Sequence, residues 1–585
     1  MKSPAFPVTI LHKRGHSTTL VVLLHAFNRT SERLADVRRV VEEDDPNADI
    51  LAPNLPFSFT SMVHPSSVVA DLLIQIDQAF ERSQQDGSPG YQRIRLIGHS
   101  MGALFVRKLY VCACGEHQAA PFEASLKDYL KARNAQPLSL KRPWADSVDR
   151  IILLAAMNRG WSVSHHQSLS KAFWATSGVF IGHIMGIIFG RMPIVFSVRR
   201  GAPFLTQLRL QWLFMRRAAQ SDSGQSGTAL TVQLLGSVDD LISPNDNVDL
   251  VAGKDFIYLD VPESGHSNIV EMDDSEEGRA RRNIFKAALT QPSEVLKAGQ
   301  LLQEDVISIE SEKVTDVVFV IHGIRDEGYW TQKIARRVMV KGQEMGLKFA
   351  SETSSYGYFP MLSFLNPLRR REKVEWLMDQ YAEACARYPT AERFHYVGHS
   401  NGTYLLARAL SEYPACRFHR VVFAGSVVQR QYNWQQFMPR QVGAVLNFVA
   451  SQDWVVAYFP KGLQSLKLQD LGSAGHDGFI KGPDVFQPDD YIQGGHSAAL
   501  NESMWDGIAN FLVTNPIQIP ALPASLLSKQ RPWWVRYPVW PLVWLGLLGI
   551  MWFGYWVITY LAPAEWAPAF VLVYLFLLWK IVTKV

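Results

Sequence analysis

The chain of 585 residues is too long for a single domain, because a domain usually contains about 100 to 200 residues. Apolar residues make up 48% of it and charged residues 19%, a composition that excludes a disordered or collagen-like protein. Lys and Arg number 58 against 54 Asp and Glu, and this small net charge of +4 predicts no nucleic-acid partner. The four cysteines form no pair of CxxC clusters, which favours a reducing compartment over a disulfide scaffold or a zinc site.

No secretory signal is predicted at the start of the first half, since prolines and basic residues precede any apolar run. A strand is predicted over Thr19 to Leu24 and ends in the sequence His-Ala-Phe-Asn. A helix is predicted over Val68 to Phe80, and a second apolar strand leads into Gly-His-Ser-Met-Gly, where Ser100 stands 75 positions after His25. This alternation of short strands with helices predicts βα units and a parallel sheet.

A long insertion follows, at about residues 160–228. Part of it, Phe173 to Phe189, is strongly apolar and carries glycines at intervals of four. We interpret this part either as a packed helix or as a cap that binds acyl chains or faces a membrane, because Arg191 and Pro193 end it too early for a span. The polar stretch 290–313 predicts a linker between two domains, 1–289 and 314–515.

The second half repeats the same order of elements. A strand over Val317 to Ile321 ends in His-Gly-Ile-Arg, and a helix is predicted over Val374 to Ala386. Ser400 lies in Gly-His-Ser-Asn-Gly, 78 positions after His322, so the spacing is nearly that of the first half. Two α/β domains in tandem are therefore predicted, each with a mostly parallel sheet and flanking helices.

The C-terminal end predicts a transmembrane helical hairpin over residues 538–583. Val539 to Ala562 contains 24 residues without a charge, enough at about 1.5 Å per residue to cross a hydrocarbon core of about 30 Å. A second apolar stretch, Trp566 to Trp579, spans if Lys580 extends its amine to the interface. Basic residues flank both ends of the hairpin and Glu565 lies at its tip, which places the domains on the cytoplasmic side. A buried core helix is the alternative.

Both serines lie in Gly-x-Ser-x-Gly between a predicted strand and a predicted helix. In this context the serine occupies a strained turn that raises its Oγ above the sheet, and the glycines let helix and strand approach closely. One such pentapeptide could be a glycine-rich turn, but its duplication in matched context favours two nucleophiles, Ser100 and Ser400. The adjacent His99 and His399 are interpreted as packing residues, because neighbouring side chains on such a turn point apart.

With these motifs the two halves resemble the α/β-hydrolase superfamily, most closely its lipase and esterase branch. The resemblance covers about Val8 to Leu289 and Val314 to Val513, and the first loop has Ala26 where the family has glycine. It implies a serine hydrolase without metal or organic cofactor, and an oxyanion hole made of two backbone amides in each domain. These are the amides of Phe27 and Met101 in the first domain and of Ile324 and Asn401 in the second.

The resemblance also implies an aspartate and then a histidine later in the first domain. A strand predicted over Leu230 to Leu235 leads into a Gly-x-x-Asp turn that contains Asp239, with the adjacent Asp240 as the alternative. His266 follows the next predicted strand, Phe256 to Leu259, and is the implied base. His183, inside the apolar insertion, is a competitor that does not follow a strand.

The same order is implied in the second domain. A strand predicted over Leu446 to Ala450 leads to Asp453, which lacks the family's glycine three residues earlier. His496 is the implied base, and His476, in a polar glycine-rich loop, is its competitor. In each domain the histidine would take the serine proton, and the aspartate would orient the imidazole and stabilise its cation. For any one Asp or His taken alone, a solvated loop residue is the alternative.

Together these features predict a membrane-anchored serine hydrolase that cleaves carboxylic esters, with an ester or lipid substrate and membrane lipids as its partners. A thioesterase, acyltransferase or amidase on the same scaffold is the enzymatic alternative. The alternative from another class is a membrane scaffold in which one or both domains have become binding modules.

Overall fold

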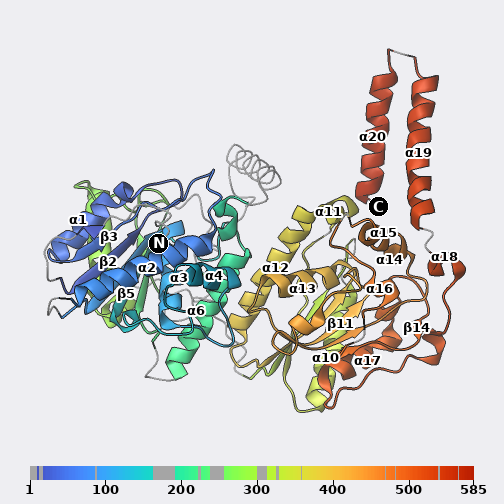
Figure 1. Ribbon diagram of the computed structural model, residues 1–585, viewed down its shortest axis with the longest axis horizontal. Coiled ribbons are helices and arrows are strands. Elements are labelled where there is room, and N and C mark those ends of the chain that lie inside the picture. The colour runs from blue at the N-terminus through green and yellow to red at the C-terminus, as the bar shows by residue number, and fades with distance from the viewer. Residues whose placement is uncertain are drawn as a thin grey trace. The chain divides into compact units, whose positions relative to one another are not determined.

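The computed structural model describes residues 10–11, 17–85, 89–161, 192–221, 226–237, 249, 256–298, 313–324, 329–357, 359–467, 469–480, 482–537, 540–563 and 565–584. The chain divides into two compact units. The first contains Met1–Ile309 together with the short segments Met378–Arg387 and Tyr413–Ala415, and the second contains the rest of the chain from Glu310 onward. Each unit contains its own large sheet (Figure 1).

The first sheet is almost entirely parallel. Its strands are β1 (Ile10–Leu11), β2 (Thr19–Leu24), β3 (Asp49–Leu51), β4 (Arg93–His99), β5 (Val148–Leu154), β6 (Leu230–Gly236) and β7 (Phe256–Val261). They lie in the order β1-β3-β2-β4-β5-β6-β7, and only β1 is antiparallel to its neighbour. The central strands are apolar and buried on both faces, as parallel strands covered by helices must be.

Helices cover both faces of this sheet. On one face, α2 (Pro65–Ser83), α3 (Met101–Cys114), α4 (Ala124–Ala132) and α6 (Pro203–Ser221) share an apolar core with the strands. On the other face, α1 (Ala35–Asp44), α8 (Glu276–Thr290) and α9 (Ser293–Ala298) form a second core. Alternate residues of β2 enter the two cores, Val22 the first and Val21 the second, which is the period of two expected for a strand.

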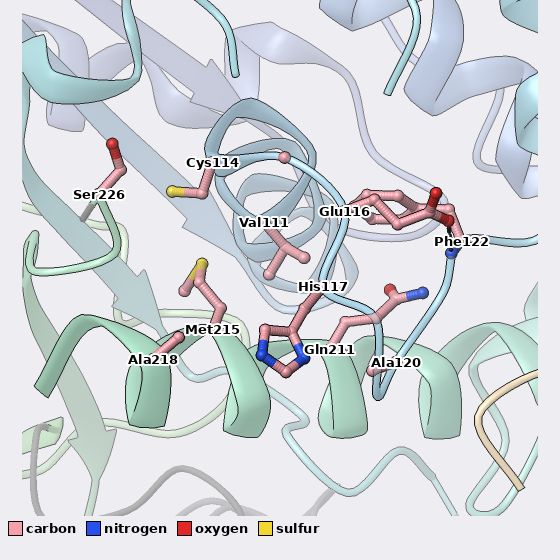
Figure 2. Close-up of a pocket in the computed structure, with 11 residues that line it drawn as sticks. Val111, Cys114, Glu116, His117, Ala120, Phe122, Gln211, Met215, Ala218 and Ser226 are labelled. Carbon is pink, nitrogen blue, oxygen red and sulfur yellow. Dashed lines mark hydrogen bonds between the residues drawn. The ribbon is translucent and has the colours of Figure 1, made fainter. Parts of the chain in front are cut away.

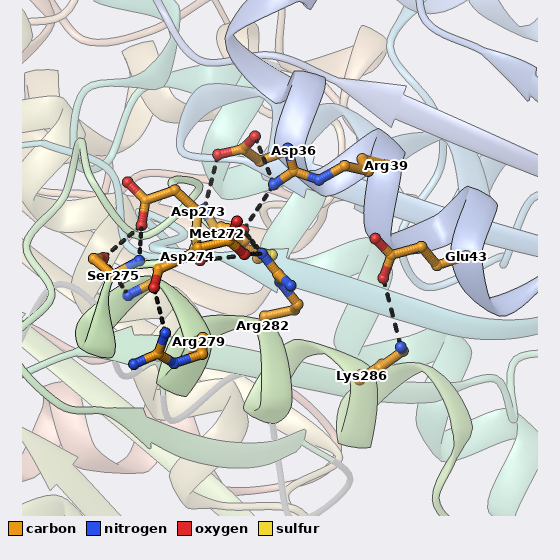
Figure 3. Close-up of polar contacts among 11 residues, drawn as sticks. Asp36, Arg39, Glu43, Met272, Asp273, Asp274, Ser275, Arg279, Arg282 and Lys286 are labelled. Atoms are coloured by element: carbon orange, nitrogen blue, oxygen red, sulfur yellow. Dashed lines mark hydrogen bonds and ion pairs between the residues drawn. The ribbon is translucent and has the colours of Figure 1, made fainter.

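Polar contacts also join α1 to the segment that enters α8 (Figure 3). The Met272 amide donates to the Asp36 carboxylate at 2.9 Å, and the Arg39 guanidinium donates to the Met272 carbonyl at 2.9 Å. Ser275 caps α8 by accepting the Gly278 amide. Because residues 267–275 connect His266 to α8, these contacts also hold the chain that follows His266.

The second sheet is parallel throughout. Its strands are β8 (Asp316–Ile321), β9 (Phe349–Glu352), β10 (Arg393–His399), β11 (Phe418–Ala424), β12 (Val442–Asn447) and β13 (Val485–Phe486), in the order β13-β12-β11-β10-β8-β9. Its larger helices are α10 (Tyr329–Glu344), α12 (Pro367–Arg387), α13 (Asn401–Glu412) and α17 (Glu502–Val513), of which α10 and α17 share one core. The predicted fold class, two tandem α/β domains of one design, is confirmed.

Three sequence predictions differ from the structure. The predicted cap insertion, 160–228, includes α6, whose Leu208 and Trp212 are fully buried in the core against α3, so this part is core and not cap. The predicted linker 290–313 begins with α9, which buries Leu296 in the first domain. The strand predicted over 446–450 is β12, which starts earlier and ends at Asn447. Residues 162–191, with the apolar stretch and His183, lie outside the described residues.

The C-terminal residues form a helical hairpin that follows the second domain. It consists of α19 (Trp540–Leu561) and α20 (Ala567–Lys584), preceded by the short α18 (Trp533–Arg536). Within the described residues, α19 is the one helix that is long and apolar enough to cross a membrane, and the apolar part of α20, Ala567–Leu578, is shorter. Large apolar side chains of α19, such as Leu542 and Trp552, are exposed, which distinguishes it from a buried core helix.

Candidate active site

Ser100 and Ser400 occupy equivalent sharp turns in the two domains. Ser100 joins β4 to α3 with φ of 53°, and Ser400 joins β10 to α13 with φ of 51°. Both amides donate to the neighbouring strand, that of Ser100 to the Leu154 carbonyl at 2.9 Å and that of Ser400 to the Ala424 carbonyl at 3.0 Å. A positive φ is costly for serine, so the surrounding structure holds both residues in the strained geometry of a nucleophile elbow.

The glycines of the two motifs are required by close packing. A Cβ on Gly102 would lie 2.3 Å from the Leu24 carbonyl oxygen, and one on Gly402 would lie 2.6 Å from that of Ile321. Both carbonyls belong to the strand beside the elbow, β2 or β8. The helix after each serine can therefore approach that strand only without a side chain at this position.

His266 reaches Ser100 in the first domain. Its Nε2 lies 2.7 Å from Ser100 Oγ, and both residues are buried. The Nε2–H of His99 donates to the His266 carbonyl at 2.8 Å, and burial lowers the pKa of His99 to about 3. His99 is therefore a neutral residue that supports the His266 loop, in agreement with its interpretation as a packing residue.

The predicted acid of the first site lies outside the described residues. Asp239 and Asp240 both lie in 238–248, outside the described part of the chain, and stay predictions. The structure does describe the end of β6, where a Cβ on Gly236 would lie 2.3 Å from the Ser264 carbonyl. The end of β6, three residues before Asp239 in the sequence, thus lies directly beside the loop of His266.

Asp453 and His496 form a buried pair in the second domain. His496 Nδ1 donates to Asp453 Oδ2 at 2.9 Å, and Asp453 Oδ1 accepts the Val456 amide at 3.0 Å. Burial acts to raise the pKa of Asp453, but His496 and the amide outweigh it and hold this pKa below its usual value. Burial acts to lower the pKa of His496, but the Asp453 carboxylate outweighs it and raises this pKa.

The second site differs from the first in the contact to serine. No hydrogen bond joins His496 Nε2 to any residue that the structure describes. Gly425, with φ of 55°, faces the ring so closely that a Cβ there would lie 2.8 Å from His496 Cε1. The first site therefore shows the serine–histidine contact and the second shows the histidine–aspartate contact.

The loops after β2 and β8 are each fixed by the histidine that ends the strand. His25 donates from Nδ1 to the Ala26 carbonyl at 2.8 Å and accepts the Leu55 amide at Nε2. His322 donates to the Gly323 carbonyl at 2.8 Å and accepts the Ser355 hydroxyl. The recurrence of a histidine at both strand ends is the sequence signal for this structural role, which the motif analysis alone does not reveal.

These loops carry two of the four predicted oxyanion amides, those of Phe27 and Ile324. The other two, of Met101 and Asn401, are the first amides of α3 and α13, where N–H groups have no partner within the helix. The side chain of Asn401 is fully buried and donates to Tyr356 Oη at 3.2 Å, a contact that the sequence did not predict.

The residue after the strand-end histidine differs between the two loops. A Cβ on Gly323 would lie 2.8 Å from Ser400 Cβ, whereas the first domain accommodates Ala26 at this position, buried. The alanine that departs from the family pattern is thus compatible with the first loop.

Two cavities lie away from the serines. One, of about 80 Å³, is lined by Val111, Cys114 and Met215 at the end of α3 that is farthest from Ser100 (Figure 2). Burial raises the pKa of the Cys114 thiol to about 12, so it is no competing nucleophile. The other, of about 300 Å³, is lined by Asp316 and Arg393 at the starts of β8 and β10, whereas Ser400 follows the end of β10.

The predicted competitor His476 makes its hydrogen bonds to residues other than Ser400. Its ring nitrogens contact Asp477 Oδ1 at 2.7 Å and the Val535 carbonyl at 3.1 Å. Among the described residues, no group of three or more His, Cys, Asp or Glu side chains is arranged to hold a metal ion.

No protein-family model matches the sequence, and no curated protein matches it. Similar solved structures include an esterase of Pyrobaculum calidifontis, with 12% identity over 48% of this chain and 79% of that chain at a TM-score of 0.29. A soluble variant of the monoglyceride lipase of Saccharomyces cerevisiae is similar at 10% identity, 51% and 91% coverage and a TM-score of 0.30. A peroxisomal α/β-hydrolase of the same yeast is similar at 14% identity, 49% and 82% coverage and a TM-score of 0.30. Similarity at this level identifies no activity or substrate for the chain.

Proposed function

We propose that the chain is a membrane-anchored serine hydrolase that cleaves carboxylic esters, with Ser100, Asp239 and His266 as one triad and Ser400, Asp453 and His496 as another. The observation that carries the proposal is the 2.7 Å contact between His266 Nε2 and Ser100 Oγ on a strained elbow. Such a contact prepares a serine for nucleophilic attack, because the histidine can accept its proton.

The proposed reaction has two steps. His266 takes the proton of Ser100 as Oγ attacks the ester carbonyl, and the amides of Met101 and Phe27 stabilise the resulting oxyanion. The protonated histidine then gives this proton to the departing alcohol, which leaves an acyl-serine. Water, deprotonated by the same histidine, attacks the acyl group, releases the carboxylic acid and restores the serine.

Labelling with a fluorophosphonate tests this proposal, because only an activated serine reacts. The full chain should be labelled at Ser100, and the double variant Ser100→Ala/Ser400→Ala should neither label nor hydrolyse p-nitrophenyl esters. Unchanged hydrolysis by the double variant would exclude both serines and, with them, the proposed function.

One observation favours a second candidate for the second domain alone. Since His496 Nε2 has no hydrogen-bond partner among the described residues, this domain could serve as a binding module without hydrolysis. Labelling of Ser400 in the Ser100→Ala variant distinguishes the two roles, because a binding module should not label.

The anchoring part of the proposal rests on the hairpin. We infer that α19, with α20, inserts into a membrane and that the basic residues flanking the hairpin keep both domains on the cytoplasmic side. Protease protection in sealed vesicles tests this orientation, because domains on the outer face of inside-out vesicles should be digested.

A further inference from the structure

The membrane hairpin begins with a stem, residues 526–537 and 540–544, that contacts the parts of the second domain carrying Asp453 and His496. On the acid side the link is the short helix α14 (Trp454–Tyr458), which Asp453 caps. At the other end of α14, the Tyr458 carbonyl accepts the Trp544 indole N–H at 2.9 Å, and the Tyr458 hydroxyl donates to the Trp534 carbonyl at 2.8 Å. A helix of five residues thus has the candidate acid at one end and the stem at the other.

The indoles of the stem are closely packed against the next helix. In α15 (Pro460–Ser465), a Cβ on Gly462 would lie 3.1 Å from Trp544 Nε1 and 3.2 Å from Trp540 Cε3. The glycine therefore leaves space for the start of α19 to lie on α15. Figure 1 shows the base of the hairpin beside α14 and α15.

On the histidine side the link is a small antiparallel sheet. Strand β15 (Leu527–Ser528) of the stem pairs with β14 (Tyr491–Ile492), and the Gln493 amide donates to the Leu526 carbonyl at 2.6 Å. The Arg531 guanidinium lies 4.2 Å from the centre of the Tyr491 ring. This sheet ends four residues before His496.

The two sides are also joined to each other beneath the site. The Ser451 amide donates to the Ile492 carbonyl at 2.8 Å, and the Gln452 amide donates to the Gly494 carbonyl at 2.9 Å. The loop before Asp453 and the loop before His496 therefore form one unit, which the stem holds through α14 and β14.

The competitor histidine of the sequence analysis belongs to the same contact. His476 in α16 (Ala474–Asp477) contacts Asp477 through Nδ1 and donates from Nε2 to the Val535 carbonyl of the stem, and Arg531 donates to the His476 carbonyl. Both His476 and Val535 are buried. This histidine serves the docking of the stem and not proton transfer from Ser400.

We propose that the stem contributes to the geometry of the second site. Tyr458 and Trp544 are positioning residues that keep Asp453 within hydrogen-bond distance of His496. The inference rests on the proposed function of that site and deepens it: the second site is complete only while the membrane hairpin is docked. Neither positioning residue touches the reacting atoms. Small displacements of catalytic groups are costly, since an error of about 1 Å can slow a reaction about 100-fold.

The test uses the full chain in lipid vesicles with Ser100→Ala as background, so that Ser400 alone can label. Tyr458→Phe/Trp544→Phe removes one hydroxyl and one indole N–H donor and keeps a smaller or equal aromatic ring at both positions. The matched control is Tyr560→Phe/Trp552→Phe, the same pair of changes at exposed positions of α19. The readouts are the rate of fluorophosphonate labelling at Ser400, its pH profile, and hydrogen exchange of the amides of Gln452, Val456 and Gln493.

We expect the stem variant to label about 10- to 100-fold more slowly and to exchange these amides faster, with the control unchanged. Its pH profile should also move to lower pH, because a looser carboxylate raises the pKa of His496 less; a merely structural loss would lower the rate at every pH alike. Tyr458→Phe alone, a milder change, should give an intermediate rate. Unchanged exchange in the stem variant, or equal effects in the control, would overturn the proposal. If Ser400 labels in none of these proteins, the catalytic role of the second site fails, and the exchange rates still decide whether the stem holds the two loops.

Discussion

Single residues determine whether the two elbows can form. Ser100 and Ser400 keep a positive φ, which costs about 1–3 kcal/mol for such a residue and persists only if the packing around it is tight. That packing depends on glycine, since a Cβ on Gly102 would overlap the Leu24 carbonyl at 2.3 Å. A single added methyl group at Gly102 should therefore disturb the local structure of the elbow.

Gly102→Ala should destabilise the first domain by about 1–3 kcal/mol, because helix α3 must move away from β2 to admit the methyl group. Labelling of Ser100 should fall as well. Chemical denaturation measures the stability of Gly102→Ala against that of the wild type, and equal stability of the two would show that the close approach is not rigid.

Ser100→Ala should abolish labelling of the first domain. In the Ser400→Ala background, it should lower ester hydrolysis at least about 1000-fold, because the covalent route is lost. Mass spectrometry of the labelled peptide and hydrolysis of a short p-nitrophenyl ester give the two readouts. Ser400→Ala serves as the comparison and should retain the Ser100 label. If ester hydrolysis persists after Ser100 is replaced in this background, another residue must carry the activity.

The Asp453–His496 pair predicts a specific pH dependence of the second site. His496 acts as a base when neutral, so labelling of Ser400 should rise with pH through the raised pKa of His496. In Asp453→Asn this pKa should fall, the midpoint should move to lower pH, and the maximal rate should drop by up to about 10⁴-fold. The control is Asp506→Asn, an exposed carboxylate on α17. A midpoint that stays in place in Asp453→Asn would contradict the pairing.

The same pair makes stability depend on pH in a defined direction. Its contribution is lost as pH falls through the lowered pKa of Asp453 and as pH rises through the raised pKa of His496, and it is largest between the two. Thermal unfolding of the wild type against Asp453→Asn should therefore differ most in that interval.

At the scale of secondary-structure elements, the sequence predicted those strands and helices whose bounds depend on the local residue pattern. The strand Thr19–Leu24 has the predicted bounds, and the helices after both serines begin at the motif, because strand, glycine turn and helix follow one another within a few residues. The roles of α6 and α9 were not predictable in this way. Both lie in stretches that look like a cap or a linker, and only the partner surface on the sheet decides that Trp212 and Leu296 are buried.

In the candidate site, too, local sequence features were predictable and contacts between distant parts of the chain were not. The family resemblance, applied to the order of residues along the chain, implied His266 and the Asp453–His496 pair, and the structure shows a hydrogen-bond partner for each. The sequence did not predict the contacts of Tyr458 and Tyr356, since neither residue belongs to a motif and each contact joins distant parts of the chain.

As an element, the hairpin can be separated from the domains by truncation. Deleting 532–585 should release the protein into the soluble fraction, because it removes the exposed apolar helices, and should leave Ser100-dependent hydrolysis of a short soluble ester. Sedimentation after high-salt and carbonate washes, with ester hydrolysis in the supernatant, measures both effects. A truncated chain that still sediments with membranes would locate an anchor elsewhere, with Phe173 to Phe189 as the first segment to test.

For the whole molecule, the duplication poses the question of why one chain has two candidate sites. The two domains share their strand order, yet 139 residues separate Ser100 from Asp239 and only 53 separate Ser400 from Asp453. Some of the additional residues in the first domain belong to its core, because α6 packs against α3. What is left for a cap in the first domain is chiefly the apolar segment between Trp161 and Pro193, and the second domain has no insertion of that length at this place.

We therefore expect the two sites to differ in the length of the acyl chain that they accept. An apolar cap over the first site would bury each added methylene for about 0.8 kcal/mol, which gives at most about a fourfold gain in kcat/KM per methylene. Long acyl esters should then depend on Ser100, whereas Ser400 should act mainly on short ones. Measuring kcat/KM against acyl length in Ser100→Ala and Ser400→Ala separates the two profiles, and a variant lacking residues 173–189 serves as the control for the cap. Parallel profiles in the two serine variants would show that the insertion does not set specificity, because the only large difference between the domains at this position would then have no effect on the substrate.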